Sequence, residues 1–166
     1  IVTVRKFVEA MVDYDSSHGG KVVNTMAGTR TNEAIVDIRE FASGISIESI
    51  IEKIEGEILA GNEKIIERPI YGYTMVDSLK AITTFNAFGE MYGWSNERAV
   101  FFSGVHYGRS PMIAIRAHPV KPRMAVYVKP KSVDPLAPKL ADMEKVVLVK
   151  TDLDESTIVE RLRYIR

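Results

Sequence analysis

The stretch Arg98-Ala99-Val100-Phe101-Phe102-Ser103 is a short apolar run with a polar residue at each end. Two runs of the same kind follow it, Met124-Ala125-Val126-Tyr127-Val128 and Val146-Val147-Leu148-Val149. Continuous apolar runs of this length are typical of parallel strands that are covered on both faces. The three runs therefore predict the centre of a buried, mostly parallel sheet.

The first two runs are each followed by a polar loop and then by a sequence typical of a helix start. Ser110-Pro111 and Asp134-Pro135 fit this role, because Ser or Asp can cap a helix and Pro is tolerated in its first turn. They predict helices over 111–118 and 135–143. Residues 112–115 are also compatible with a strand.

The third run leads into a helix predicted over 155–165, whose apolar residues form one stripe. Strand, loop and helix thus occur three times in succession. This order predicts right-handed crossovers and helices on both sides of the sheet. We therefore expect an α/β protein with three α/β/α layers around a mostly parallel central sheet, plus an N-terminal helical segment.

The residues before the first run are less regular. Ser46 is placed to cap one helix, and Thr74, with Asp77 three residues later, is placed to cap another. The expected elements are helices over 2–14, 31–41, 46–54 and 75–88, and short strands over 21–26, 57–61 and 65–71.

The composition excludes several classes of site. The 166 residues include no Cys, which rules out disulfides, thiolate zinc sites and iron–sulfur clusters. Formal net charge is zero, so the total gives no electrostatic attraction to nucleic acid. No apolar run is long enough to span a membrane, and we expect a cytoplasmic protein without membrane contact. The chain begins at Ile1 rather than Met, as a piece of a longer protein would.

The loops after the first two strands contain the candidate ligand residues. Ligands of open α/β sheets bind beyond the carboxyl ends of the strands, where helix N-termini and basic side chains favour anions. We expect a small anionic or phosphorylated ligand here, while a polar connection without a ligand explains the same residues. The candidate ligand-binding residues are Gly104, His106, Tyr107, Gly108, Arg109, Ser110, Lys129, Lys131, Ser132 and Asp134.

No complete catalytic set can be assembled from these residues. The segment Gly104 to Ser110 has one residue too few between its glycines for a Walker motif. His106 and His118 are twelve residues apart with no acidic residue at metal-binding spacing. We therefore assign no catalytic residue, metal or cofactor, and favour a protein that is not an enzyme. A small enzyme using His106, Arg109 and Lys129 on a phosphorylated substrate is the alternative.

Four segments resemble the DRTGG-domain family. Ile45 to Gly61 (ISIESIIEKIEGEILAG) is similar to its opening helix and strand. Ile66 to Ile70 and Thr74 to Leu79 are similar to its second strand and long helix, and Lys145 to Asp154 (KVVLVKTDLD) to its closing strand and turn. The resemblance covers residues 45–163.

The motifs that name the family are mostly replaced in this chain. Its Asp-Arg would fall within 104–109, where only a Gly and an Arg remain, and its Thr-Gly-Gly within 127–132, where there is no Gly. The resemblance implies a regulatory module, such as those found beside CBS domains or after winged-helix DNA-binding domains.

The resemblance also suggests how the chain is divided and what it binds. It implies an α/β domain over 45–166 and an N-terminal extension over 1–44, for which the remnant of a winged-helix domain is one interpretation. We expect a non-catalytic regulatory domain for small-ligand sensing, homodimerisation or both, which reaches DNA only through residues or domains outside this chain. The alternative is the effector half of a transcription regulator.

Overall fold

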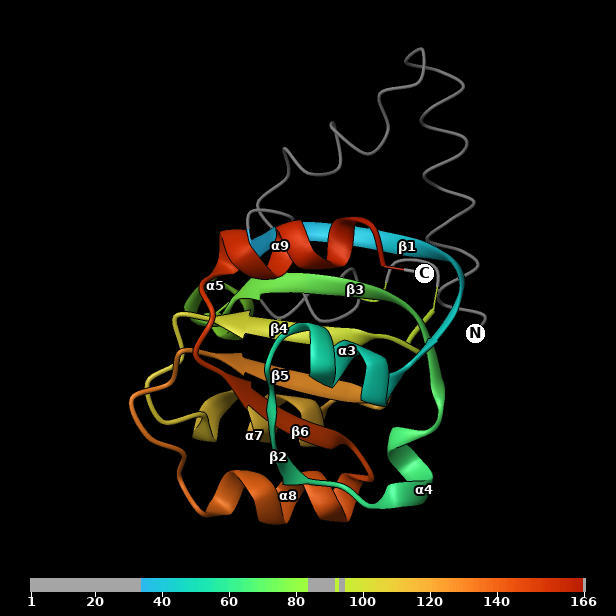
Figure 1. Cartoon of the computed structure of the whole chain (residues 1–166). Helices are drawn as coiled ribbons and strands as arrows, with labels where there is room; N and C mark the ends of the chain where they lie inside the picture. The colour runs from blue at the N-terminus through green and yellow to red at the C-terminus, as the bar shows by residue number, and fades with distance from the viewer. Residues whose placement is uncertain (1–33, 84–91, 93–94, 166) are drawn as a thin grey trace, which may run out of the picture.

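The computed structural model describes residues 34–83, 92 and 95–165, and in this part the chain is built around one six-stranded sheet. The strand order is β1-β3-β4-β5-β6-β2, which can be followed in Figure 1. The strands are β1 (Ile35–Ser46), β2 (Glu57–Ala60), β3 (Pro69–Asp77), β4 (Ala99–Ser103), β5 (Met124–Val128) and β6 (Val147–Thr151).

The four central strands are parallel, and each is next to the strand that precedes or follows it in the chain. β3 pairs with β4, β4 with β5, and β5 with β6. The two outer strands run antiparallel to their neighbours, β1 along β3 and β2 along β6. The three strands predicted from the apolar runs are β4, β5 and β6, and the prediction of a mostly parallel sheet is confirmed.

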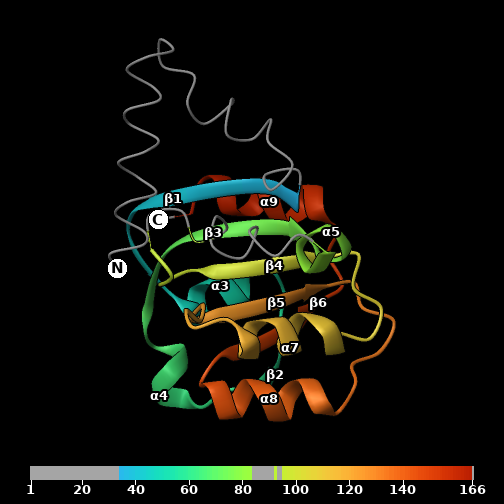
Figure 2. The same ribbon diagram turned by 180° about the vertical axis from the view of Figure 1, so that it is seen from behind.

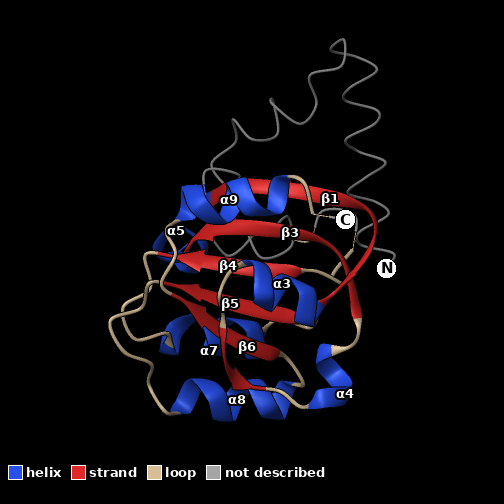
Figure 3. Ribbon diagram, viewed as in Figure 1, coloured by secondary structure: helices blue, strands red, loops and turns tan. Residues whose placement is uncertain are grey.

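Helices cover both faces of this sheet, as Figure 3 shows by colour. α3 and α9 lie over the face seen in Figure 1, and α5, α7 and α8 lie over the face seen in Figure 2. The helices are α3 (Ile47–Lys53), α4 (Glu63–Ile66), α5 (Ser78–Thr83), α7 (Arg109–Ala117), α8 (Leu136–Glu144) and α9 (Glu155–Arg163).

Two hydrophobic clusters form the core, one on each face. Side chains alternate between the faces along a strand, so Phe101 packs with Ile50 and Ile158 on one side, and Phe102 packs with Met112 on the other. This explains why the central strands are continuously apolar. All residues of β4 and β5 are buried.

Several helix starts are where the sequence predicts them. The Ser46 hydroxyl accepts a hydrogen bond from the Ser49 N–H (3.2 Å) at the start of α3. The Asp134 carboxylate accepts from the Leu136 N–H (2.8 Å) at the start of α8. Asp154 caps α9 by accepting from the Thr157 N–H (2.8 Å). The helices predicted over 111–118, 135–143 and 155–165 are confirmed as α7, α8 and α9.

The helix predicted over 31–41 is wrong. Residues 35–46 form β1, an edge strand that pairs with β3. The pairing is supported by side chains, because the Tyr73 hydroxyl donates a hydrogen bond to Asp37 and Arg98 forms an ion pair with Glu40. The tertiary partner decided between helix and strand, as it often does when local preference is weak.

Two further predictions on the following segment are also corrected. The strand expected over 65–71 begins only at Pro69, because α4 occupies 63–66 and Asn62 caps it. The helix expected over 75–88 begins later than predicted. β3 continues to Asp77, whose carboxylate accepts from the Lys80 N–H (3.0 Å) at the start of α5.

Some predictions fall outside the described residues. These are the helix over 2–14, the strand over 21–26, the N-terminal helical segment and the winged-helix remnant. β1 runs across position 44, and the division into 1–44 and 45–166 stays a prediction. Within the part of the chain that the structure describes, no helix has the length and apolar character needed to span a bilayer.

Candidate functional site

The loops after β4 and β5 lie against each other at the carboxyl ends of the parallel strands. The main-chain N–H groups of Lys131 and Ser132 both donate to the carbonyl of His106 (2.9 and 3.2 Å), and the N–H of Asp134 donates to the carbonyl of Tyr107 (2.8 Å). Both views of the ribbon show the loops side by side at this end of the sheet. The predicted meeting of the two loops is confirmed.

Gly108 fixes the first of these loops. Its φ of 75° lies in the left-handed region, and a Cβ added to it would lie 2.0 Å from Cε2 of Tyr127. The buried Tyr127 hydroxyl donates a hydrogen bond to the Gly108 carbonyl, and burial raises the pKa of this phenol. The absence of a side chain at Gly108 therefore lets the loop close onto β5.

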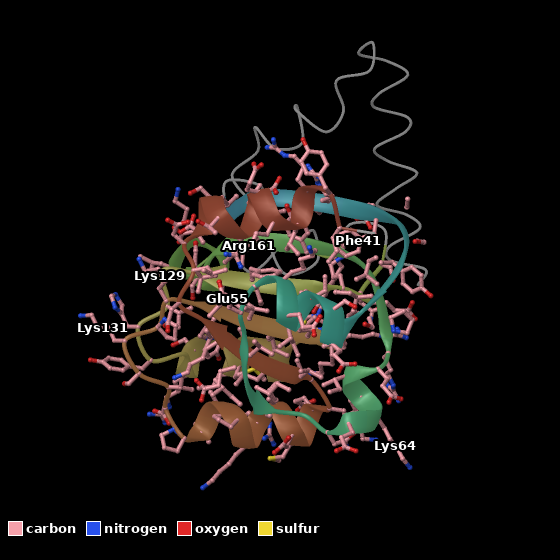
Figure 4. The ribbon with its side chains drawn as sticks, viewed as in Figure 1. Phe41, Glu55, Lys64, Lys129, Lys131 and Arg161 are labelled. Carbon is pink, nitrogen blue, oxygen red and sulfur yellow. The ribbon has the colours of Figure 1, made fainter. Side chains whose placement is uncertain are left out.

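Most of the candidate side chains at this edge face solvent. The exposed ones include His106, Arg109 and Ser110 from the first loop and helix, and Lys129 and Lys131 from the second loop. Figure 4 shows Lys129 and Lys131 at the end of the sheet where the strand arrows point. The arrangement can present positive charge to an anion without prior rearrangement of the backbone. That these residues bind a ligand stays a prediction.

Two candidate residues have structural roles that differ from the expected ones. Ser110 does not cap α7, because the helix begins at Arg109 and its N-cap is Gly108, which makes no side-chain capping bond. Asp134 precedes Pro135, the N-cap of α8, and its carboxylate accepts a hydrogen bond from the Leu136 N–H. Asp134 therefore supports the second loop through both its side chain and its main chain.

Most main-chain amides of the second loop already donate hydrogen bonds within the protein. Those of Lys131, Ser132 and Asp134 donate to the first loop, and that of Lys129 donates to the Thr151 carbonyl (2.8 Å). Each N–H has one hydrogen to donate. An anion bound at this loop would consequently be held by side chains rather than by a cradle of backbone N–H groups.

Lys129 connects this edge electrostatically to the start of α9. The pKa of the exposed Asp154 carboxyl is lowered from its ordinary value, first by the hydrogen bonds from Thr157 and Ser156 and, to a smaller extent, by the charge of Lys129. Lys129 also has a φ of 48°, in the left-handed region that favours glycine. The chain thus carries a long basic side chain where its backbone would be easier to form with Gly.

A second polar cluster, around Arg98, was missed by the sequence analysis, which treated Arg98 as the polar end of a strand. Its side chain is fully buried and forms an ion pair with Glu40. It also donates to the carbonyls of Ser95 (2.6 Å) and Tyr73 (3.3 Å) and to the Thr74 hydroxyl (3.0 Å). Burial lowers the pKa of this guanidinium and Glu40 opposes the change. A charge directly before an apolar run is the signal that could have found it.

The described residues contain no group of three or more His, Asp or Glu side chains placed to hold a metal ion. His118 accepts a hydrogen bond from the Val120 N–H (3.1 Å) at the opposite end of α7 from His106. The two histidines are therefore parts of different regions of the molecule.

Comparison with known structures defines the class of fold. The chain superposes with a TM-score of 0.50 and 13% identity on the crystal structure of the CBS and DRTGG domains of the regulatory region of Clostridium perfringens pyrophosphatase, complexed with the activator diadenosine tetraphosphate. The match covers 69% of this chain and 44% of that one. The fold is therefore DRTGG-like, as the sequence resemblance predicts.

Comparison of sequences defines the family. No family model matches the chain. It is 36% identical over 171 residues to an uncharacterized HTH-type transcriptional regulator of Methanocaldococcus jannaschii, covering 98% of this chain and 70% of that protein. It is 35% identical over 166 residues to another of Archaeoglobus fulgidus, covering 96% of this chain and 71% of that protein. The chain belongs to this family of archaeal HTH-type transcriptional regulators.

Proposed function

We propose that this chain is the effector half of a transcription regulator, in which the α/β domain binds a small anionic or phosphorylated ligand and another part of the regulator contacts DNA. The membership in a family of HTH-type regulators is the observation that carries the proposal. The described domain is an α/β sheet, not a helix-turn-helix unit, and the formal charge of the whole chain is zero. Such a charge gives little attraction to phosphate backbones.

The relatives are longer than the part of them that this chain matches, which is 70% and 71% of their length. A DNA-reading unit in the remaining part of the relatives would leave the α/β domain free to respond to a ligand. We place the response at the carboxyl edge of the sheet, where the loops after β4 and β5 are held together and basic side chains are exposed. A regulator of this kind works beside DNA, and we therefore also propose a cytoplasmic location.

A phosphorylated ligand is supported by two separate observations. The cations Arg109, Lys129 and Lys131 are exposed at the proposed site, and side chains of this kind bind phosphate groups well. The activator in the DRTGG-like structure of the pyrophosphatase regulatory region is itself a phosphate-bearing compound.

The test measures first whether a compound binds this chain and then whether it changes the DNA affinity of a full-length relative. Inorganic phosphate, acetyl phosphate and AMP are screened for a rise in the melting temperature of this chain. Each compound that binds is then added to the full-length Methanocaldococcus regulator bound to duplex DNA selected from a random pool. We expect a change in DNA affinity of about 5-fold to 150-fold. Binding without any effect on DNA affinity would reject the effector role, and steady conversion of the compound would support an enzyme instead.

We also propose that the domain forms a homodimer through the outer side of the helical layer seen in Figure 2. Leu79 on α5, Ile113 on α7 and Met143 on α8 are 71%, 46% and 62% exposed, and α7 packs against both other helices. Helix-turn-helix regulators commonly bind paired half-sites as dimers. Native mass spectrometry should show a dimer that Ile113→Glu separates. Ile58→Glu, at an exposed position on β2, is the matched control and should remain a dimer. If Ile113→Glu also remains a dimer, this surface is not the interface.

A further inference from the structure

Tyr107 lies in the first loop of the carboxyl edge, two residues before Arg109, and its main chain is bonded to the loop that carries Lys129 and Lys131. Its side chain is 58% exposed. The carbonyl of Tyr107 accepts a hydrogen bond from Asp134, and the carbonyl of His106 accepts two. The His106 ring is 6.5 Å from the Tyr107 ring, between centroids. A flat group that stacks on Tyr107 would therefore meet an aromatic ring whose backbone is held by hydrogen bonds from the second loop.

The neighbouring cations are available to a ligand. Within the described residues, no ion pair at 4.0 Å or less involves Arg109, Lys129 or Lys131, whereas Arg98, Arg123 and Lys150 are each paired with a glutamate. Because the amides of Lys129 and Lys131 are bonded elsewhere, the Lys129 and Lys131 ammonium groups are the positive charges that the second loop offers to an anion.

The backbone conformation at Lys129 also supports a binding role for this residue. Three residues other than glycine have positive φ in the described chain: Glu55, Lys129 and Lys145. Glu55 follows α3 and Lys145 is the C-cap of α8, and this conformation is common where helices end. Lys129 instead follows the central strand β5. An unfavourable conformation that places a cation at the carboxyl edge is consistent with use of that cation, since such conformations cluster at binding sites.

We propose that the ligand of this site is a phosphate monoester that also carries a flat aromatic ring, such as a nucleoside monophosphate. Tyr107 stacks on the ring, and Lys129, with Lys131 and Arg109, holds the phosphate. Stacking on an exposed aromatic side chain tolerates different bases, so the arrangement selects for a ring joined to a phosphate rather than for one base. The inference rests on the proposed ligand response and adds its chemical class.

The test uses AMP, ribose 5-phosphate and adenosine, which separate the ring from the phosphate. Their dissociation constants for this chain are measured by calorimetry. We expect AMP to bind more tightly than ribose 5-phosphate by about 5-fold to 100-fold, the usual contribution of one stacked base. Tyr107→Ala should remove this difference and leave the binding of ribose 5-phosphate unchanged.

A second pair of variants tests the cation. Lys129→Gly should weaken AMP and ribose 5-phosphate to the same degree, by about tenfold or more. Lys145→Gly is the matched control, because it makes the same substitution at the same kind of backbone position away from the site, and it should change neither. Melting curves of the free variants show whether each one folds.

The outcomes separate this inference from the effector role. If AMP and ribose 5-phosphate bind equally, and Tyr107→Ala changes neither, the stacking of a ring on Tyr107 is wrong. The proposal of an anion-responsive regulator would then remain. If Lys129→Gly binds both phosphates as tightly as the unaltered chain, Lys129 does not hold the phosphate. If none of the three compounds binds, the site proposal fails, while the effector role is decided separately by the DNA measurement with inorganic phosphate and acetyl phosphate.

Discussion

At the amino end of the central strands a charged side chain is buried among carbonyl oxygens, whereas at the carboxyl end the backbone is bonded to itself and the charged side chains face solvent. Arg98 belongs to the first region, and Lys129 and Lys131 to the second. The difference shows how one sheet can separate two uses of polar groups. Polar groups at the amino end hold the outer strand β1 to the sheet, and those at the carboxyl end face solvent, where we propose that a ligand binds.

The largest effect is expected at the amino end. Arg98→Met should lower the free energy of unfolding by about 3–5 kcal/mol, because it removes the buried guanidinium that pairs with Glu40 and donates to the carbonyls of Ser95 and Tyr73. Urea denaturation measures the loss. Lys150→Met, which breaks the exposed pair with Glu57, is the control and should cost less than about 1 kcal/mol. Similar losses in both variants would mean that the buried pair has no special role.

The next effect distinguishes two glycines of the carboxyl edge. Gly108→Ala should destabilise the fold by about 2–4 kcal/mol, because the new methyl group meets the Tyr127 ring and the φ of 75° disfavours it. Gly104 has a similar φ of 73°, but a Cβ added there would meet nothing within 4 Å. We therefore expect Gly104→Ala to lower the free energy of unfolding by only about 1–2 kcal/mol. The difference between the two isolates the packing against Tyr127. Equal losses in the same urea measurement would show that the loop can move away from β5.

Tyr127→Phe should lower the free energy of unfolding by about 1–3 kcal/mol at neutral pH, because the buried Gly108 carbonyl loses its donor. The loss should shrink in alkali. Burial raises the folded-state pKa of Tyr127 above its ordinary value of 10.0, so the unfolded chain ionises first, and the stabilising effect is present below about pH 10 and lost above it. Unfolding curves from pH 7 to 11 measure this. A constant difference between the proteins would contradict the assignment.

The smallest effect has the opposite sign. Lys129→Gly should raise the free energy of unfolding by about 0.5–1 kcal/mol, since relief of the left-handed backbone outweighs the greater freedom of Gly in the unfolded chain. Lys145→Gly should give a similar gain. A loss of stability in Lys129→Gly alone would mean that its side chain supports the fold, and the contrast between the two ends of the sheet would weaken.

The sequence predicts the centre of this fold better than its edges, for a physical reason. The apolar runs of β4, β5 and β6 are buried on both faces, so composition alone identifies them. β1 is half exposed and contains Asp37, Arg39 and Glu40, whose partners Tyr73, Arg163 and Arg98 are distant in the chain. The local preference of a segment for helix or strand carries no information about such distant partners. This is why the helix predicted there was wrong.

The candidate site shows the same division. The meeting of the two loops follows from the order of parallel strands and was predicted. The cap at Gly108, the use of the loop amides and the backbone at Lys129 depend on contacts across the sheet, such as those of Tyr127 with Gly108 and of Thr151 with Lys129. Ser110-Pro111 looked like a helix start in the sequence, and the helix begins one residue before it.

The placement of the two outer strands has a consequence for the order of folding during synthesis. β1 and β2 are adjacent in the chain, on either side of α3, yet they lie at opposite edges of the sheet. β2 at Glu57–Ala60 pairs with β6 at Val147–Thr151, and the Thr151 hydroxyl donates to the carbonyl of Ile54, 97 residues earlier. A ribosome therefore releases β2 long before its partner β6 is synthesised. Closing so long a loop between paired strands is slow. Until β6 emerges, the apolar side of α3 has no complete surface to cover it, and exposed apolar surface of this kind favours aggregation of a nascent chain.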